Sequence, residues 1–497
     1  MIVDDTDVEN IYNEREIISD VTALSSTLYF SQALYIVRGF IIAKVLGPST
    51  YGVWSIFRSF FSSAPYFGLG TQQAMLREVP FSIGAGDKLK KRHIIQTSLS
   101  WNVLLTSLVM VIAFIFSFTG FPIGYKEEIR LAGILFVLNA IHLFMRPKFI
   151  SEQKILLLSK YMLSYTILNT VFGLTLLLFF KLSGLLMGMI LAQIILITYL
   201  IINNHLSLHL FIDKNILNEL FHIGFPIMIL LLLIFLMGNA DKFIIFIMLG
   251  KTMAGYYGLA AFVSSMVTYI SYSISTVVFP RMMYVYGKTH EMKHIEKYFK
   301  KPIVVLSGLI PIILGIIYIN IEAVINFFLP QFMPGVTVLH ILIVALFFST
   351  IWGLPTNLLI ALNKQIKFMY MTAILLFLSI VLDVAVIRSG FGMNGVAIVT
   401  TLNFFLSSVI ANGYALFSLK NRRLQILRNL SMIYWPFIYS FTGMFFIISI
   451  SFSKSNYLDN LMKSIIYLVF CIPLIIYIEK KIGIFGKLFS TIKIFKN

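Results

Sequence analysis

Charged residues and cysteines are scarce in this sequence. Only 12% of its 497 residues are charged, whereas 59% are hydrophobic. A soluble protein could not cover its surface with so few charges, so the composition indicates a membrane protein. The single cysteine, Cys471, lies in an apolar run, which excludes a disulfide framework and a cysteine-based metal site.

The sequence also lacks the features of a secreted chain and of a soluble enzyme. Its first 21 residues hold seven acidic side chains and the single Arg15, so they do not begin as a signal peptide does. We expect residues 1–21 to be an acidic cytoplasmic segment. No Walker A loop or His-Glu-x-x-His motif occurs, and the interior loops reach only about 23 residues, too short for a catalytic domain. We therefore expect no enzyme, and no cofactor or metal beyond a coupling ion, Na⁺ or H⁺.

Apolar stretches of roughly 20 residues recur along the chain, and each could cross the ~30 Å hydrocarbon core of a bilayer. The pattern predicts an all-α polytopic membrane protein with about fourteen transmembrane helices. Their expected ranges are 22–46, 51–78, 94–118, 129–150, 158–180, 183–203, 222–249, 253–278, 302–320, 336–360, 366–388, 391–418, 432–452 and 462–479.

The two halves of the chain repeat one another at an offset of 203 residues. At this offset Gly47 coincides with Gly250 and Gly52 with Gly255, and the first six expected helices fall on the next six. An even number of helices per copy gives a parallel repeat, as some transporters have. The sequence thus predicts two six-helix lobes and an appended helix pair. The expected boundaries are 22–203 for the N-lobe, 204–221 for a cytoplasmic linker, 222–418 for the C-lobe, and 419–497 for helices 13 and 14 with a basic cytoplasmic tail.

Lysine and arginine are distributed unevenly between the two ends of the expected helices. With the N-terminus inside, the cytoplasmic segments hold 28 of these residues and the outer segments hold 7. This positive-inside bias predicts a multi-pass protein with both termini in the cytoplasm, and we expect a bacterial inner membrane location. The formal charge of +18 is therefore attributed to topology and lipid headgroups, and no nucleic-acid partner is expected.

Short motifs in both lobes resemble those of a transporter family. The first helix contains Arg38 and closes in Leu46-Gly47-Pro48, and Tyr51-Gly52 follow the turn. The second lobe has the motifs Gly224-Phe225-Pro226, Asp241-Lys242 and Gly255-Tyr256-Tyr257-Gly258-Leu259-Ala260. In their order and spacing, these motifs resemble the O-antigen (Wzx-type) polysaccharide flippases of the multidrug/oligosaccharidyl-lipid/polysaccharide (MOP) exporter superfamily.

The resemblance implies a MATE-like fold, with two lobes flanking a central cavity that opens alternately to either side. Members of this flippase family move oligosaccharide repeat units, carried on undecaprenyl diphosphate, to the outer leaflet for O-antigen, capsule or exopolysaccharide biosynthesis. Membrane lipid and the polymerase of the pathway would be further partners. Fourteen helices is also the number in the related lipid II flippases. Two alternatives remain open, a cation-coupled multidrug antiporter of the same superfamily and a membrane-embedded polysaccharide polymerase.

Three arginines are candidates for binding the substrate diphosphate, because an unpaired anion is costly in an apolar layer. Arg38 lies nine residues before Gly47, about 13 Å from the outer end of its helix at 1.5 Å per residue. Arg58 is at comparable depth on the next helix, and Arg146 lies near the cytoplasmic end of helix 4. A structural ion pair remains an alternative for Arg38, and snorkelling to the interface remains one for Arg38 and Arg146.

Three further residues are candidates for coupling or gating. Asp241 occupies the repeat position of Arg38 and precedes Lys242. Ion coupling, a salt bridge and contact with a sugar hydroxyl are all open for Asp241. Adjacent residues diverge by about 100° on a helix, so Asp241 and Lys242 cannot both face one partner. Asp383, near the outer end of helix 11, is the third candidate, with an interfacial position as the alternative.

Two prolines fall inside expected helices and are candidate hinges. Pro311 and Pro355 each remove one hydrogen bond from the helical ladder and permit a kink. Such a kink could serve rocking lobes, or it could be a static bend.

Overall fold

The structure is a computed structural model that describes residues 14–118, 124–207, 209–264, 267, 292–362, 364–453 and 455–482. All regular secondary structure in these ranges is helical. Eleven helical segments among the described residues are long and apolar enough to cross a membrane. The all-α, multi-pass fold class expected from the sequence is therefore confirmed. Most of the expected acidic segment, most of the tail and part of helix 253–278 lie outside the described ranges.

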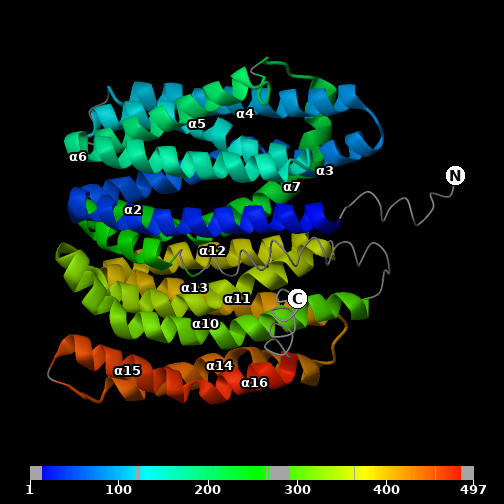
Figure 1. Cartoon of the computed structure of the whole chain (residues 1–497). Coiled ribbons are helices and arrows are strands. Elements are labelled where there is room, and N and C mark those ends of the chain that lie inside the picture. The colour runs from blue at the N-terminus through cyan, green and yellow to red at the C-terminus, as the bar shows by residue number, and fades with distance from the viewer. Residues whose placement is uncertain are drawn as a thin grey trace. The chain divides into compact units, whose positions relative to one another are not determined.

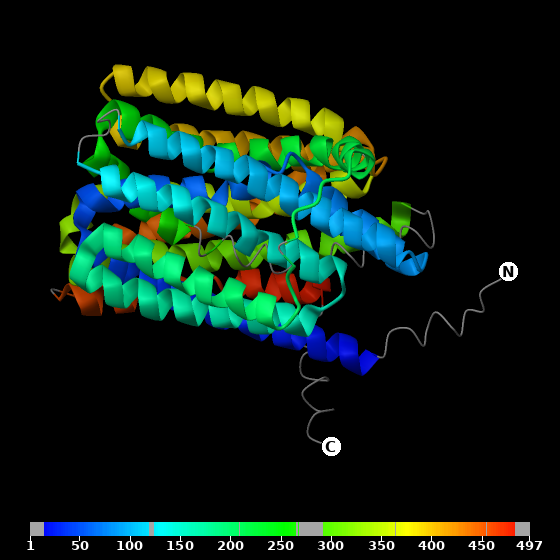
Figure 2. The same cartoon turned by 90° about the horizontal axis from the view of Figure 1, so that it is seen from above.

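Two compact units divide the chain, Met1–Asn239 and Ala240–Asn497. The first unit is built from α2 (Glu14–Ser62), η1 (Ala64–Tyr66), α3 (Thr71–Gly84), α4 (Lys88–Phe116), α5 (Lys126–Ser151), α6 (Ile155–Ile202) and α7 (Lys214–Met237). In this unit α6 packs against α2 and α5, and α4 packs against α5, as Figures 1 and 2 show. The core between α3, α4, α5 and α6 is apolar and includes Met75, Phe144 and Phe149.

Two long helices in this unit contain kinks. α2 includes the first expected helix and the start of the second, and it bends at Gly47, which has φ 68° and is followed by Pro48. α6 includes the fifth and sixth expected helices and bends at Lys181, which has φ 50°. Glycine adopts such a backbone conformation without strain, whereas lysine does so rarely. The kinks mark the places where the hydropathy pattern predicted helix ends.

The second expected helix, 51–78, is not continuous. After α2 ends at Ser62, η1 contains Pro65, and the chain then turns through Leu69 (φ 49°) and Gly70 (φ 92°) before α3 begins. Proline removes a backbone donor and glycine permits left-handed backbone, so this stretch interrupts the helix. The seventh expected helix, 222–249, is also interrupted, because α7 ends at Met237 and α8 begins at Ala240. Hydropathy alone misses both breaks because the segments remain apolar.

The second unit begins with α8 (Ala240–Leu249), and residues 251–264 continue as a helix. Its remaining elements are α10 (Met292–Phe328), η2 (Pro330–Gly335), α11 (Val336–Ala361), α12 (Gln365–Arg388), α13 (Gly392–Ser418), α14 (Arg423–Ile448), α15 (Asn456–Phe470) and α16 (Ile472–Ile482). α11 packs against α10 and α13, and α12 packs against α13. α8 contacts α12 and α13.

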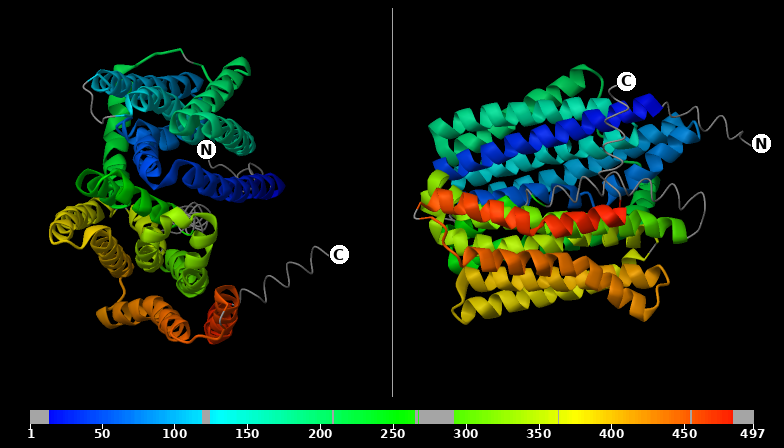
Figure 3. Two further views of the ribbon diagram at one scale, coloured as in Figure 1. Left: turned by 90° about the vertical axis from the view of Figure 1, so that its left-hand side faces the viewer. Right: turned by 60° about the horizontal axis from the view of Figure 1, so that its bottom comes forward.

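Two glycines leave room for aromatic rings of α15, one on α10 and one on α14. Tyr467 of α15 occupies the space that a side chain at Gly315 would need, and its hydroxyl donates a 2.9 Å hydrogen bond to the carbonyl of Pro311. On α14, Gly443 likewise accommodates the ring of Phe470. Figure 3 shows α14, α15 and α16 (orange to red) as neighbours within this unit.

The two compact units do not end where the expected lobes end. The sequence places the start of the C-lobe at residue 222, whereas α7 packs against α3 and α4 in the first unit. Gly70 and Gly224 approach so closely that a Cβ on either would overlap the backbone of the other. The lobe boundaries themselves stay a prediction.

Candidate functional site

Arg38 is buried in the first unit, with 5% of its surface exposed. Its guanidinium lies against α6, where the Nη2 atom is 3.2 Å from the position of a Cβ on Gly173. The Nε and Nη2 groups donate no hydrogen bond to any described residue, and none of the ion pairs in this part of the chain includes Arg38. The structural ion pair considered from the sequence is thus absent from this part of the chain. Arg38 is therefore a buried cationic side chain with no ion-pair partner among the described residues.

Neutral polar side chains from α5 and α6 surround this region. Tyr165 lies within electrostatic range of Arg38 and stacks on His142, with ring centroids 3.6 Å apart. The Nδ1 atom of His142 is 2.6 Å from the Tyr161 hydroxyl. Gln193 Nε2 donates to the Asn139 side-chain oxygen at 3.3 Å. The sequence analysis did not predict this network. The four-residue spacing of Tyr161 and Tyr165 places both on one face of an apolar helix and could have indicated it.

Arg58 and Arg146 occupy different surroundings. Arg58 is half-buried on α2, within electrostatic range of Tyr51, which lies two turns earlier. Arg146 is half-buried on α5, one turn beyond His142 and close to the end of the helix at Ser151. Both positions are compatible with the expected roles, and Arg38 is the most enclosed of the three.

A charged cluster at the end of α5 was not predicted. Glu152 pairs with Lys91 of α4 at 3.0 Å, with Lys148 at 3.4 Å and with Lys154 at 3.3 Å. Burial raises the pKa of the Glu152 carboxyl, but the three ammonium groups outweigh this effect and hold its pKa below the ordinary value. Lys148 Nζ also donates to the carbonyl of His205 at 2.5 Å. The cluster therefore joins α4, the α5–α6 turn and the segment after α6.

In the second unit, Asp241 and Asp383 belong to one buried cluster. Asp241 on α8 is 7% exposed, and Asp383 on α12 is 1% exposed. The hydroxyl of Tyr257 donates to Asp241 Oδ2, and Thr400 Oγ1 on α13 lies 3.3 Å from the same atom. Asp383 lies within electrostatic range of Asp241, and its Oδ1 atom accepts no hydrogen bond from the described residues. The interfacial alternative for Asp383 does not fit this burial.

Lys242 is buried beside Asp241 on α8, and its backbone N–H donates to Asp241 Oδ1 at 2.9 Å. The cluster offers carboxylate and hydroxyl oxygens, and Thr400 Oγ1 is also 2.9 Å from the Val396 carbonyl oxygen. Oxygen ligands of this kind suit a hard cation, and a carboxylate pair also suits a proton. Among the described residues, no group of three or more His, Cys, Asp or Glu side chains could hold a metal ion. Binding of Na⁺ or H⁺ at this cluster stays a prediction.

The two candidate hinge prolines lie within continuous helices. α10 runs from Met292 to Phe328 through Pro311, and α11 runs from Val336 to Ala361 through Pro355. Both prolines are buried, and the carbonyl of Pro311 is held by Tyr467. The Tyr467 contact favours a static bend at Pro311, and the hinge role of both prolines stays a prediction.

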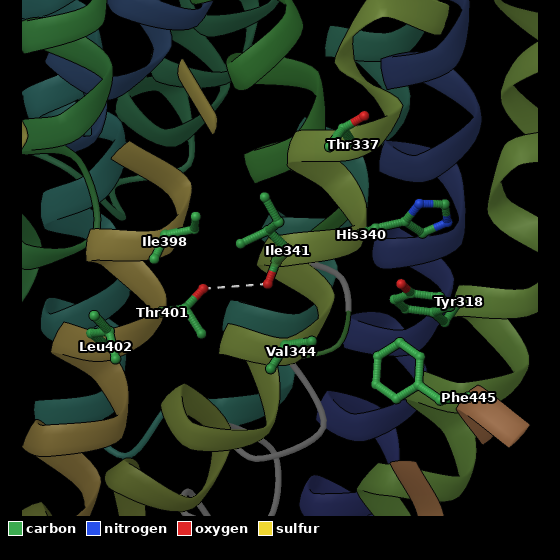
Figure 4. A pocket seen from close by; sticks show the side chains of 9 residues that line it. All are labelled: Tyr318, Thr337, His340, Ile341, Val344, Ile398, Thr401, Leu402 and Phe445. Atoms are coloured by element: carbon green, nitrogen blue, oxygen red, sulfur yellow. Dashed lines mark hydrogen bonds between the residues drawn. The ribbon is translucent and has the colours of Figure 1, made fainter. Parts of the chain in front are cut away.

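A cavity of about 380 Å³ in the second unit lies among α10, α11, α13 and α14. Figure 4 shows its lining, which is largely apolar. His340 stacks on Tyr318 at one side, with ring centroids 4.3 Å apart, and Thr401 donates to the carbonyl of Ile341 at 3.3 Å. None of the candidate residues from the sequence lines this cavity. The acidic cluster and this cavity are therefore separate features of the unit.

Solved structures with a similar fold are transporters. The lipid II flippase MurJ, in an inward closed conformation, matches with a TM-score of 0.68 and 16% identity, over 90% of this chain and 97% of that chain. A MOP superfamily transporter from Pyrococcus furiosus Vc1 matches with a TM-score of 0.61 and 14% identity, over 81% and 96%. A eukaryotic MATE transporter matches with a TM-score of 0.60 and 15% identity, over 84% and 98%. At these identities the likeness shows the fold, which is that of MOP superfamily transporters and confirms the expected MATE-like class.

Sequence comparison gives the family. No curated protein matches the chain significantly. Residues 41–334 match the family described as "Polysaccharide biosynthesis protein", which agrees with the resemblance seen in the motifs. Because this match spans more than half of the chain, the protein belongs to the polysaccharide biosynthesis protein family.

Proposed function

We propose that this protein is a flippase that moves oligosaccharide units, linked to undecaprenyl diphosphate, across the bacterial inner membrane. The family supports a role in polysaccharide biosynthesis, and the fold supports transport in preference to enzymatic catalysis. One similar structure is a lipid II flippase by name, and lipid II flipping is a related task. Alternating access between two lobes, with both termini cytoplasmic, is the mechanism and topology that we assign.

The observation that carries this proposal is the buried guanidinium of Arg38, whose Nε and Nη2 groups have no hydrogen-bond partner among the described residues. A diphosphate that enters an apolar layer loses its hydration, which costs several kcal/mol unless a cation compensates. Arg38 has free N–H groups for that contact, and arginine can bind two phosphate oxygens at once. Arg58 and Arg146 are assigned supporting contacts along the path, while the polyprenyl chain remains in lipid.

We assign ion coupling to the Asp241–Asp383 cluster. Two buried carboxylates that share a site repel one another when both are ionised, so binding of Na⁺ or a proton relieves that repulsion. The Tyr257 and Thr400 hydroxyls beside Asp241 could complete an oxygen site. Occupation of the site would then favour one conformation of the transporter, which is the requirement for coupling.

A cation-coupled multidrug antiporter is the second candidate, because the acidic cluster could also receive an organic cation. The charge of Arg38 distinguishes the flippase from the antiporter. A diphosphate substrate requires the Arg38 cation, whereas an organic cation is repelled by it.

The test follows the leaflet location of the lipid-linked oligosaccharide in cells that lack the protein, using a glycan-cleaving reagent added outside. We expect the glycolipid to accumulate where the reagent cannot reach, and Arg38→Ala to reproduce this defect. The matched control is Arg130→Ala, since Arg130 in the same unit donates to Ser117 and lies over the Phe118 ring. Normal exposure of the glycolipid in depleted cells would refute the flippase, and intact cation efflux by Arg38→Ala would favour the antiporter.

A further inference from the structure

The break between α2 and α3 lies beside a cluster of neutral polar side chains without hydrogen-bond partners. On α3 the atoms are Thr71 Oγ1, Gln72 Nε2 and Gln73 Oε1, and on α4 they are Ser98 Oγ, Trp101 Nε1 and both amide atoms of Asn102. None of these atoms meets a partner among the described residues. Such groups are individually destabilising in a membrane protein interior, so seven in one place require an explanation.

The two sets of side chains lie at the same level of a helical hairpin. α3 ends at Gly84 and α4 begins at Lys88, and α3 and α4 pack together. Thr71 lies thirteen residues before the end of α3 and Trp101 thirteen residues after the start of α4, so each is about 20 Å from the turn. The cluster therefore lies well inside the first unit, between the hairpin and α7, whose Phe221 contacts the Trp101 ring.

The α3 N-terminus lies at this place, where the backbone N–H of Thr71 donates to the Gly68 carbonyl at 3.1 Å. Its N-cap residue is Gly70, which supplies no side-chain cap. The first turn of a helix presents backbone N–H groups that need acceptors. Thr71 is 0% exposed, Gln72 4% and Asn102 0%, and the Asn102 amide lies directly against Gly68. Buried side chains whose polar atoms lack partners among the described residues therefore lie at the start of α3 and on the part of α4 beside it.

The mixture of donors and acceptors indicates the chemistry of the ligand. Both amide atoms of Asn102 lack partners, so in either orientation of the amide its ligand must accept one hydrogen bond and donate another. A phosphate only accepts, and a hydrocarbon does neither. Hydroxyl groups do both, and the cluster contains no charged side chain. A sugar fits this set of partners, because its hydroxyl groups are neutral and each can donate and accept.

We propose that Ser98, Trp101 and Asn102, which share one face of α4, form with Thr71 at the start of α3 a subsite for the sugar hydroxyls of the transported glycan. The proposal rests on the proposed function and deepens it, because Arg38 would bind the diphosphate and this cluster the sugar. In this structure the cluster is closed. Leu69 and Gly70 hold left-handed backbone at the joint before α3.

The test compares two probes on the purified full-length protein in lipid nanodiscs. One probe is bare polyprenyl diphosphate, and the other carries a single N-acetylglucosamine. We expect the wild type to bind the sugar-bearing probe about tenfold more tightly, as one to two added hydrogen bonds would give. Asn102→Leu should reduce this preference to less than about twofold, while binding of bare polyprenyl diphosphate is unchanged. Ser98→Ala, which removes only a hydroxyl, should reduce the preference partially.

The matched control is Asn412→Leu. Asn412 on α13 is equally buried and also has an unpartnered side-chain oxygen, but it belongs to the other unit. This variant should keep the full preference for the sugar-bearing probe. If Asn102→Leu keeps the preference, or if the wild type shows none, the subsite is refuted and the flippase proposal stands. If the wild type binds neither probe, the proposed function fails and the subsite fails with it.

Discussion

The Arg38 side chain on α2 lies directly against Gly173 on α6. Its Nη2 atom is 3.2 Å from the position that a Cβ on Gly173 would take, a spacing tighter than nine in ten real Cβ contacts. Any side chain at position 173 must therefore displace the guanidinium by a few tenths of an ångström. The position of this buried charge depends on the absence of a side chain on the neighbouring helix.

Gly173→Ala should reduce glycolipid flipping about threefold or more, since small displacements of a charged contact can lower rates strongly. Alanine also favours helix over glycine, so the variant should be at least as stable as the wild type. The measurement is the initial flipping rate in proteoliposomes, with the melting temperature as a check on folding. Gly133→Ala on α5 is the matched control, because its Cβ would make ordinary 3.4 Å contacts. Equal rates for both variants would contradict the role of Arg38.

Asp383→Asn should abolish the dependence of transport on the coupling ion. The substitution keeps the shape of the side chain but removes the charge that makes the site responsive. Transport is measured across gradients of Na⁺ and of protons. Asp213→Asn provides the control, since Asp213 caps α7 through the N–H of Asn215 at 2.9 Å and asparagine can cap equally well. Asp213→Asn should keep the dependence of transport on the ion. If Asp383→Asn also keeps this dependence, coupling at this cluster is contradicted.

Glu152 should make the stability of the protein sensitive to acid. Its folded-state pKa lies below the ordinary value, so the unfolded chain binds the proton more readily. The stabilisation is complete above the unfolded pKa of about 4.3 and is lost as the pH falls through the folded pKa. Melting temperatures of the purified protein between neutral and acidic pH provide the measurement.

Glu152→Gln should lower the melting temperature at neutral pH, because Lys91 and Lys148 then lose their charged partner, at a cost of about 1–3 kcal/mol. It should also flatten the acid side of the stability profile. A variant profile parallel to that of the wild type would show that another carboxylate is responsible.

Gly315→Ala should destabilise the docking of α15 on α10, because the new methyl group would overlap the Tyr467 ring. We expect a loss of about 1–3 kcal/mol, as overpacking of a filled site typically gives. Gly413→Ala on α13 is the control, since no atom of the described residues lies within 4 Å of its Cβ position. Thermal unfolding in detergent compares the two variants. Equal melting temperatures would mean that the Tyr467 ring can move aside without a loss of stability.

Hydropathy and charge predicted much of the fold and several residues of the candidate sites. Long apolar stretches predicted the helices because membrane spans must be apolar over their whole length. Arg38 and Asp241 stood out because buried charges are rare in such stretches. The breaks at Leu69 and Gly70 were not predicted, since a helix can lose its backbone hydrogen bonds without becoming less hydrophobic.

The residues that lie near these charges in the folded protein could not be predicted in the same way. Asp383 meets Asp241 only because α12 and α8 pack together, and this pairing is a property of the tertiary structure. Neutral residues such as Gln193 and Asn102 carry no charge signal, and asparagine and glutamine often satisfy their own helix backbone. Their importance becomes visible only when the packing leaves their polar atoms without partners.

The contact between Gly70 and Gly224 has a consequence for how the sequence can change over time. When a large side chain meets another side chain, a second substitution can make room for it. Here a new side chain at either position would meet backbone, which is the same for every amino acid. No single substitution elsewhere can compensate, so positions 70 and 224 should accumulate fewer substitutions than their apolar neighbours. Insertions that alter the length of the segment between η1 and α3 should face the same barrier.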